Sequence, residues 1–333
     1  MIEIVKADGT TERAFLDQLK NRSGEVDKKV TQAVSEILDQ VRCKGDEAVR
    51  EYTIRFDGKA PENPEITKEE LVSYLETGNK DIIDSLRRAE ENIRDFHTRQ
   101  KQQSWITTRE DGVLMGQRVR GLARVGIYVP GGTAAYPSSV LMNAVPAKIA
   151  GVKEIVMVTP PGKDGKPNPD IMVAAAIAGV DRVFLMGGAQ AVGALAYGTQ
   201  TVPKVDKIVG PGNIYVATAK KLLYGTVDID MVAGPSEILV LADETANPMY
   251  LAADLMSQAE HDVLASAILL TTSEEIARRT VEEVERQIKT LSRPAIIEQS
   301  LRNYGAIIVC RDLTEAVDFA NELAPEHLEV CLA

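Results

Sequence analysis

The chain reads ARVGIYVPGG at residues 123–132, KEIVMVTPPG at residues 153–162 and DRVFLMGGAQ at residues 181–190. Each stretch holds a short run of apolar, largely β-branched residues that ends at a glycine- or proline-rich turn and leads into a helical pattern. Unbroken apolar runs that alternate with helices are typical of strands buried on both faces of a parallel sheet. These stretches therefore predict an α/β fold with parallel strands.

The same pattern recurs further along the chain, in DKIVGPGN at 206–213, SEILVLAD at 236–243 and GAIIVC at 305–310. The runs at 123–129 and 181–186 also resemble each other, which suggests an internal duplication. We therefore expect two related Rossmann-like lobes with parallel sheets, preceded by a helical N-terminal region. Two lobes also suit a chain of 333 residues, since domains average ~150 residues.

Composition excludes several classes of protein. Acidic residues outnumber basic ones by 49 to 38, which argues against nucleic acid and anionic membranes as partners. The N-terminus lacks an apolar signal region, and no apolar run is long enough to span a membrane. The cysteines, Cys43, Cys310 and Cys331, are too far apart in sequence for a zinc knuckle or a disulfide framework. We expect a cytoplasmic protein.

Residues that follow or end the strand-like runs are candidates for ligand binding, because ligands bind beyond the carboxyl ends of strands in open α/β sheets. On this argument we expect four residues at that edge: Tyr128, Gln190, Asn213 and Ser236. Glycine turns before helices can cradle an anion or a nucleotide. No stretch reads G-x-G-x-x-G, however, so ordinary βα turns remain an alternative.

Two further patterns bear polar chemistry. If a helix runs through residues 251–262, Leu251, Leu255 and Gln258 lie on one stripe and His261 faces the same way. Gln258 and His261 could then be a buried polar pair or half of a zinc site. Near the end of the chain, Glu326 and His327 follow a proline-terminated helix, and a histidine can move protons near neutral pH. A solvated acid–histidine pair is the alternative there.

Taken together, these segments resemble the histidinol dehydrogenase family from about Phe56 to the last residue. The blocks that carry the resemblance are ARVGIYVPGGTAAYPSSVLMNAVPAKIAG (123–151), GGAQAVGALAYGT (187–199), KIVGPGNIYVATAKK (207–221), DMVAGPSEILVLAD (230–243), DLMSQAEHD (254–262) and NELAPEHLE (321–329). Long blocks in the same order make the resemblance specific.

The resemblance implies an NAD-dependent oxidation of L-histidinol through L-histidinaldehyde to L-histidine, the last steps of histidine biosynthesis. It implies that His327 is the general base and that Glu326 activates water for attack on the aldehyde. Gln258 and His261 would bind zinc, and with Ser236 and His327 they would contact the substrate. Tyr128, Gln190 and Asn213 would line the NAD site. The family further implies a homodimer.

The resemblance also implies a domain layout. Residues 1–23 would be an N-terminal extension, residues 24–127 with 236–333 a first lobe, and residues 128–235 a second, NAD-binding lobe. The family's C-terminal, dimer-swapped domain and two zinc ligands have no counterpart in this sequence. We therefore expect weak zinc binding and little activity from this chain alone.

Two other functions compete with the dehydrogenase. A non-catalytic α/β module could hold a nucleotide or a phosphosugar at the glycine turns. A metal hydrolase could use Glu326 and His327 with Gln258 and His261, although no H-E-x-x-H helix is present.

Overall fold

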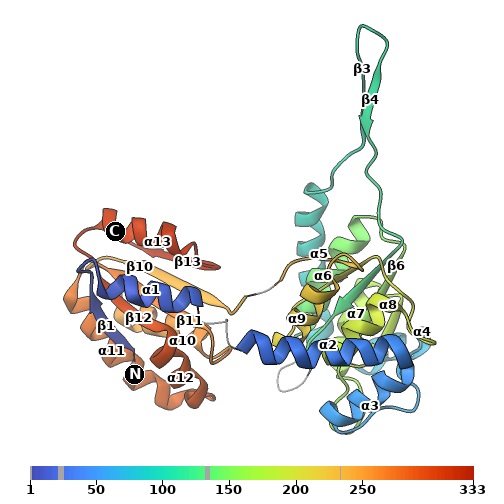
Figure 1. The fold of residues 1–333 in the computed structure, drawn as a ribbon, viewed down its shortest axis with the longest axis horizontal. Helices are drawn as coiled ribbons and strands as arrows, with labels where there is room; N and C mark the ends of the chain where they lie inside the picture. Colours follow the sequence, from blue (N-terminus) through green and yellow to red (C-terminus); the bar gives the residue numbers. More distant parts are fainter. Residues whose placement is uncertain (1, 22–25, 132–135, 233) are drawn as a thin grey trace. The chain divides into compact units, whose positions relative to one another are not determined.

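The computed structural model describes residues 2–21, 26–131, 136–232 and 234–333. These residues divide into two compact units, which we call unit 1 (Met1–Val26 with Gly234–Ala333) and unit 2 (Asp27–Ala233). Each unit has its own parallel sheet with helices on both faces (Figure 1). The predicted α/β fold with two parallel sheets is confirmed. Within the described ranges, no helix is long and apolar enough to cross a membrane.

The sheet of unit 2 has the strand order β2-β7-β6-β5-β8-β9. Its strands are β2 (Glu65–Ile66), β5 (Arg124–Tyr128), β6 (Glu154–Thr159), β7 (Arg182–Leu185), β8 (Lys207–Val209) and β9 (Asp228–Ile229). Only β2 runs antiparallel to its neighbour, β7. Numbered along the chain, the strands β7-β6-β5-β8 have the order 3-2-1-4. This is the order in which dinucleotide-binding sheets begin.

Helices cover both faces of this sheet because successive strand residues are apolar. Val156 and Val158 face one way, toward α2, α3, α8 and α9, whereas Ile155 and Met157 face α4, α5, α6 and α7. The helices are α2 (Val26–Lys44), α3 (Asp46–Asp57), α4 (Lys68–Thr77), α5 (Lys80–Arg99), α6 (Pro137–Ile149), α7 (Pro169–Ala178), α8 (Gly188–Tyr197) and α9 (Ile214–Leu223). The runs predicted as buried strands are thus buried on both faces.

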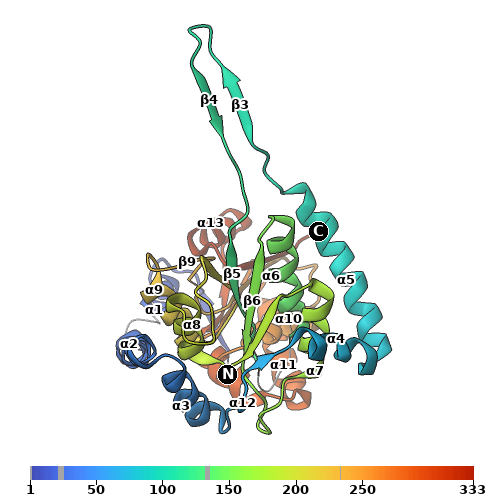
Figure 2. The ribbon, with the colours of Figure 1, turned by 90° about the vertical axis from the view of Figure 1, so that its right-hand side faces the viewer.

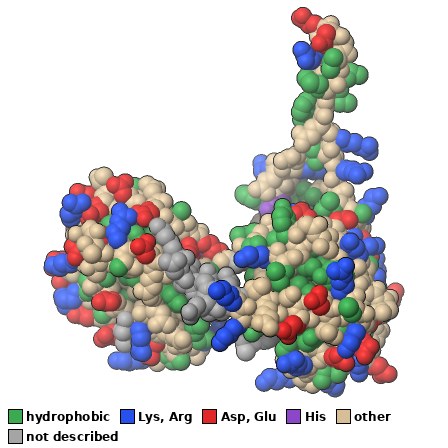
Figure 3. Space-filling model, in the orientation of Figure 1, with side chains coloured by type: hydrophobic (Ala, Val, Ile, Leu, Met, Phe, Trp, Pro, Cys, Tyr) green, Lys and Arg blue, Asp and Glu red, His purple; other side chains and the backbone are tan. Residues whose placement is uncertain are grey.

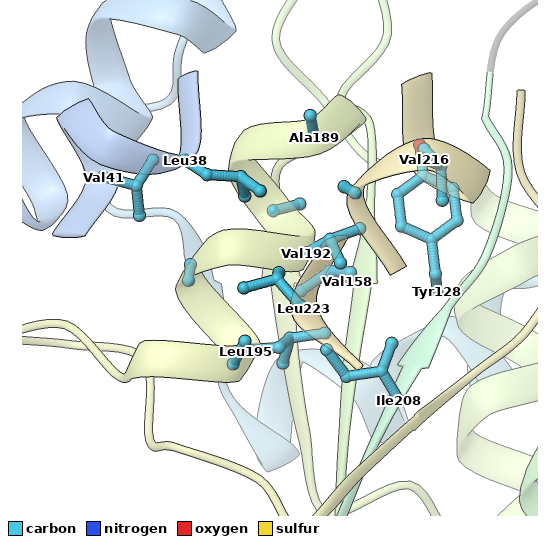
Figure 4. Packing of buried hydrophobic residues seen from close by; sticks show 14 of the residues in the cluster. Leu38, Val41, Tyr128, Val158, Ala189, Val192, Leu195, Ile208, Val216 and Leu223 are labelled. Carbon is cyan, nitrogen blue, oxygen red and sulfur yellow. The ribbon is translucent and has the colours of Figure 1, made fainter. Parts of the chain in front are cut away.

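The packing of α2 on α8 fixes the helix that carries Gln190. Leu38 and Val41 of α2 lie close to α8, since a Cβ at Gly193 would come within 3.1 Å of Leu38 Cδ2. Val192 and Leu195 of α8 point toward the sheet and join the same buried cluster (Figure 4). The absence of a side chain at residue 193 therefore lets the two helices approach closely.

The sheet of unit 1 has the order β1-β12-β11-β10-β13, with every strand parallel. Its strands are β1 (Glu3–Lys6), β10 (Glu237–Ala242), β11 (Ser266–Thr271), β12 (Gly305–Val309) and β13 (His327–Cys331). Its helices are α1 (Thr11–Asn21), α10 (Pro248–Ala259), α11 (Glu274–Gln287), the 3-10 turn η1 (Ile288–Thr290), α12 (Pro294–Tyr304) and α13 (Leu313–Leu323). In this unit α10, α11 and α12 cover one face, and α1 and α13 cover the other.

The strands β12-β11-β10-β13 also have the order 3-2-1-4 along the chain. The two units therefore repeat one topology, as the predicted relation between two lobes requires. Strand β11 had no counterpart in the sequence prediction, which considered only a helix over residues 251–262 in this region. The apolar residues of α10 and β11 are separated by a short polar segment with neither glycine nor proline, so the pattern did not separate them.

The division into units differs from the predicted layout. Residues 27–127 belong to unit 2 rather than to the lobe that contains residues 236–333. An amphipathic pattern shows that a helix has an apolar face, but not which sheet that face covers. Within the predicted extension, residues 1–23, the strand Glu3–Lys6 pairs with β12 in the sheet of unit 1.

A two-stranded hairpin extends from the body of unit 2 (Figure 2). Its strands are β3 (Trp105–Thr108) and β4 (Leu114–Gln117), which pair antiparallel. Ser104 closes its base, since its Oγ accepts a hydrogen bond from the Val119 N–H at 2.9 Å. In the described residues, both hairpin strands pair only with each other.

Candidate active site

A cavity of about 1130 Å³ lies at the carboxyl ends of the strands in unit 2. Its wall includes Tyr128 at the end of β5, Gln190 in the first turn of α8 and Asn213 before α9. β5 and β8 are the neighbouring strands at which the 3-2-1-4 order changes direction, and this is where such sheets bind ligands. The structure thus brings together three of the four residues expected at this edge. We call this space the carboxyl-edge cavity.

Tyr128 is buried and its hydroxyl is fixed. The hydroxyl oxygen accepts a hydrogen bond from the Gly188 N–H at 3.0 Å. Burial, with a small contribution from the Asp57 charge, raises the pKa of Tyr128 to about 12, although the Gly188 hydrogen bond opposes the shift. The phenol therefore keeps its proton at neutral pH, and that proton remains available for a ligand.

Gln190 has no exposed surface, and neither Oε1 nor Nε2 of its side chain has a hydrogen-bond partner. A buried amide without partners costs ~1–3 kcal/mol, so this side chain is suited to a ligand that supplies them. Gly188 makes room for it, because a Cβ there would lie 2.6 Å from Gln190 Oε1, and its φ of +63° favours glycine.

Asn213 is the N-cap of α9, where its Oδ1 accepts hydrogen bonds from the N–H groups of Tyr215 and Val216. Its Nδ2 then remains as a donor. The loop before it is held by Lys220, which is buried, donates to the Gly210 carbonyl at 3.0 Å and pairs with Asp230. Asn213 is therefore presented from a rigid loop.

Helix N-termini surround the same cavity. The N-caps of α7 and α9, Asn168 and Asn213, line it, as do Gly188, Ala189 and Gln190 in the first turn of α8. The N-cap of α8 is Gly187, which has no side chain to cap the helix, and of the first N–H groups only that of Gly188 is bound by a side chain, Tyr128. Free N–H groups at a helix N-terminus bind phosphate well. The cavity can therefore accept an anionic ligand without a G-x-G-x-x-G sequence.

Asp57 also lines the cavity, and the sequence analysis missed it. Its Oδ2 is buried without a hydrogen-bond partner, and burial raises the pKa of its carboxyl group. It is the last residue of α3, where an acid before a glycine is unremarkable in sequence. Only the packing of α3 with α8 inside unit 2 shows that this carboxyl group reaches the cavity.

The candidate residues of unit 1 gather at the opposite end of their sheet. Ser236 precedes β10, His261 precedes β11, and Glu326 precedes β13, whose first residue is His327. Gln258 lies in the last turn of α10, which leads into β11. All strands are parallel, so their amino ends meet at one edge, which we call the amino edge of unit 1. The placement of Ser236 at a carboxyl end was wrong, because it precedes its strand.

Glu326 and His327 lie side by side at this edge. Both are exposed, with 4.0 Å between His327 Nε2 and Glu326 Oε1. His327 pairs in register with Ile238 on β10. Before them α13 ends at Leu323, and its C-cap Ala324 has a φ of 44°, the only positive φ of a non-glycine residue among the described residues. A left-handed residue at this place ends the helix, and β13 follows three residues later.

Gln258 is buried on the stripe with Leu251 and Leu255, as predicted. His261 is exposed and lies beyond α10, which ends at Ala259, so the predicted helix through residue 262 was wrong. A backbone hydrogen bond of 3.2 Å from the His261 N–H to the Gln258 carbonyl keeps the two residues in one turn. Within the described ranges, no three His, Cys, Asp or Glu side chains are grouped to hold a metal ion.

A carboxyl pair beside His327 was also missed by the sequence analysis. Glu329 lies two residues along β13, on the face of the strand that bears His327, and its carboxyl group is close to that of Asp254 on α10. Burial raises the pKa of Glu329, and the Asp254 carboxylate raises it further. The contact between α10 and β13 could not be predicted from the sequence, because β13 itself was not predicted.

Comparison with known proteins adds independent evidence. The family model described as histidinol dehydrogenase matches residues 20–333. The histidinol dehydrogenase of Clostridium acetobutylicum is 54% identical over 330 residues, which cover 99% of this chain and 77% of that protein. The Lactococcus lactis enzyme is 52% identical and has the same coverages. The crystal structure of histidinol dehydrogenase from Elizabethkingia anophelis matches with a TM-score of 0.89 and 36% identity, covering 99% of this chain and 75% of that one.

Proposed function

The chain belongs to the histidinol dehydrogenase family and is an oxidoreductase, and from that premise we propose that it oxidises L-histidinol through L-histidinaldehyde to L-histidine with NAD. The observation that carries the NAD part is Gln190, whose buried and unpartnered amide lies in a cavity at the strand-order switch point. A polar ligand with phosphate groups would satisfy both the amide and the free N–H groups of α8.

The described residues fit NAD at the carboxyl-edge cavity. Tyr128 would donate its hydroxyl proton, Gln190 would supply both a donor and an acceptor, and Asn213 would donate through Nδ2. We add Asp57, whose unpartnered oxygen could accept a hydrogen bond from a ribose hydroxyl. When bound, NAD supplies the acceptor for the hydride that leaves the substrate carbon.

At the amino edge of unit 1, we propose that His327 removes the hydroxyl proton of histidinol as the hydride departs. Glu326 then activates the water that adds to the aldehyde carbon, and the resulting diol loses a second hydride to give the carboxylate. The two side chains are exposed and adjacent, so each can reach a different atom. Ser236, Gln258 and His261 are proposed substrate contacts at the same edge.

Zinc is a separate proposal for which the described residues give only partial support. Gln258 and His261 provide two candidate ligands, whereas protein zinc sites use three or four. No larger cluster of His, Cys, Asp and Glu stands near them in the described residues. We therefore propose that these two residues bind zinc only weakly by themselves, and no chemical step is assigned to the metal.

We propose that the protein is a homodimer, as the family resemblance implies, and that it acts in the cytoplasm. The proposed cytoplasmic location is supported by the free thiols of Cys43, Cys310 and Cys331, because a reducing compartment keeps cysteines as thiols.

The test of function is formation of NADH from L-histidinol and NAD, with zinc in excess. The proposal expects two NADH for each histidinol consumed, even where the rate is low, and L-histidine as the product. If no NADH forms while another nucleotide or a phosphosugar binds tightly, the chain is a non-catalytic binding module. Metal-dependent hydrolysis of esters or amides without NAD would instead support a hydrolase.

A further inference from the structure

Lys220 is the only buried lysine or arginine among the residues that the structure describes. Figure 3 shows Lys and Arg side chains on the surface of unit 2, where such side chains normally lie because burying a charge costs hydration free energy. Lys220 instead lies on the face of α9 that carries the core residues Val216 and Leu223, both labelled in Figure 4. A buried ammonium group needs partners, and these partners indicate what the residue does.

The partners of Lys220 converge on the backbone of Gly210. The Lys220 Nζ donates to the Gly210 carbonyl at 3.0 Å and pairs with the carboxylate of Asp230. Asp230 accepts a hydrogen bond from the Gly210 N–H on Oδ2 at 2.8 Å, and its Oδ1 accepts one from the Met231 N–H at 2.7 Å. The two side chains therefore hold both backbone polar groups of Gly210, and we call them the Gly210 clamp.

Gly210 is the point at which the chain leaves the sheet for the carboxyl-edge cavity. It follows β8, which ends at Val209. Its φ is +112°, and it lies so close to β5 that a Cβ would collide with the carbonyl oxygen of Tyr128, so only glycine fits. Three residues later Asn213 caps α9 and lines the cavity. A shift of Gly210 would therefore change where Asn213 presents its Nδ2 relative to Tyr128.

A second ion pair links the same two strands at their other ends. Lys207 begins β8 and Asp228 begins β9, with 2.8 Å between Nζ and Oδ2. Their side chains are 31% and 53% exposed, and exposed pairs add little stability. The side chains of the clamp are 4% and 30% exposed, and a buried pair also adds little, because lost hydration offsets the attraction. Net stability is thus a poor explanation of the clamp, and its contacts indicate a positional role.

We propose that Lys220 and Asp230 are positioning residues for the nicotinamide cofactor. They hold Gly210 against Tyr128, so that Asn213 and the N-terminus of α9 meet the cofactor in a fixed arrangement. Groups that are already ordered bind more tightly, because the ligand does not have to order them. Neither residue is among the described residues that line the cavity, so both act through the loop. The inference rests on the proposed function, which assigns NAD to this cavity.

Lys220→Met removes the ammonium group and keeps most of the side-chain volume. The dissociation constant for NADH should rise at least about tenfold, because Asn213 loses its fixed position. The KM for NAD should rise by a similar factor, with kcat changed less than about twofold. A merely structural defect would lower the fraction of active enzyme, and hence kcat, at an unchanged KM. NADH fluorescence titration and histidinol-dependent NADH formation measure these quantities.

Lys207→Met is the matched control, because it makes the same substitution in the ion pair at the other end of the same strands. It should leave the affinity for NADH unchanged. Hydrogen exchange at the Gly210 amide, followed by NMR without ligand, should quicken in Lys220→Met but not in Lys207→Met. If Lys220→Met does not fold, Lys220→Met with Asp230→Asn leaves no unpaired charge and should weaken NADH binding as much.

Two results would overturn the positioning role. One is an unchanged NADH affinity in the Lys220 variant, even if exchange at Gly210 quickens, since the position of the loop would then not matter to the cofactor. The other is an equal loss of affinity in Lys207→Met. A wild-type chain that binds no NADH would overturn the proposed function and this role together, whereas normal wild-type binding with an unaffected variant overturns the role alone.

Discussion

The sheets of units 1 and 2 have the same strand order, yet their candidate residues lie at opposite edges. In unit 2, Tyr128, Gln190 and Asn213 follow their strands and line a large cavity at the carboxyl ends. In unit 1, Ser236 and Glu326 precede their strands, at the amino ends. A repeated topology therefore did not bring a repeated site. The strand-end rule located the proposed cofactor site but would have misplaced the proposed catalytic residues.

The local surroundings of the two edges differ as well. Unit 2 offers helix N-termini and buried groups without partners, which suit a large anionic cofactor. Unit 1 offers exposed proton-transfer groups that lie next to each other, Glu326 and His327. If each edge has its own role, changes at one edge should leave the function of the other intact.

The largest effect is expected at the amino edge of unit 1. His327→Asn should slow the oxidation of both histidinol and histidinaldehyde by about 10²–10⁴-fold, the usual contribution of a general base. Glu326→Gln should slow the aldehyde step more than the alcohol step. Separate kinetics with each substrate measure this, and NADH binding should stay unchanged. Equal losses at both steps in the Glu326 variant would contradict the separate roles.

In unit 2, the burial of Tyr128 makes the stability of the fold depend on pH. Burial raises the pKa of Tyr128 to about 12, against about 10 in an unfolded chain. The folded state thus holds the proton more tightly, so this stability is complete below about pH 10 and is lost as pH rises toward 12. The free energy of unfolding should therefore fall by about 2–3 kcal/mol between these pH values because of Tyr128. Tyr128→Phe should remove this part of the fall, which urea unfolding at each pH measures. An unchanged pH dependence would show that Tyr128 ionises freely.

In unit 1, Cys310 is the buried group whose raised pKa corresponds to that of Tyr128. Burial raises the pKa of its thiol to about 12 as well, and the charges of Glu315, Asp312 and Glu12 add to the shift. Cys310→Ala should therefore also weaken the loss of stability at high pH, but without affecting NADH binding. Loss of NADH binding in this variant would contradict the assignment of the cofactor to unit 2.

Gln190 tests whether the carboxyl-edge cavity is built for a ligand at the expense of stability. Gln190→Met removes a buried amide that has no partner, so the free energy of unfolding should rise by ~1 kcal/mol. The affinity for NADH should fall about tenfold, the loss of roughly one hydrogen-bonded group. Urea unfolding and NADH fluorescence titration measure the two effects. Gln258→Met, the matched change in unit 1, should leave NADH affinity unchanged. A destabilised Gln190→Met variant would contradict the argument.

The smallest effect is expected from zinc. With only Gln258 and His261 as candidate ligands in the described residues, zinc at micromolar concentration should stay below its dissociation constant and stabilise the chain by less than ~0.5 kcal/mol. Thermal unfolding with and without zinc measures this, and His261→Ala should erase it. Stabilisation by several kcal/mol would mean that further ligands complete the site.

The sequence predicted the parts of the molecule whose signals are local. Buried strands such as Glu154–Thr159 have continuous apolar runs that are visible in the sequence. The residues of the carboxyl-edge cavity were found because strand, turn and helix follow one another in sequence. In contrast, β13 was missed because its exposed residues alternate with half-buried ones at the edge of the sheet. The membership of 27–127 in unit 2 depends on long-range packing, which no local pattern records.

The most direct test of two edges with two roles is amide chemical-shift mapping by NMR, with NADH and L-histidinol added separately. The account predicts that NADH shifts the amides around Tyr128, Gln190 and Asn213, and that histidinol shifts those around Ser236, His261 and His327. Shifts from NADH at the amino ends of β10 and β13, or from histidinol at the carboxyl ends near Asp243 and Thr271, would contradict it.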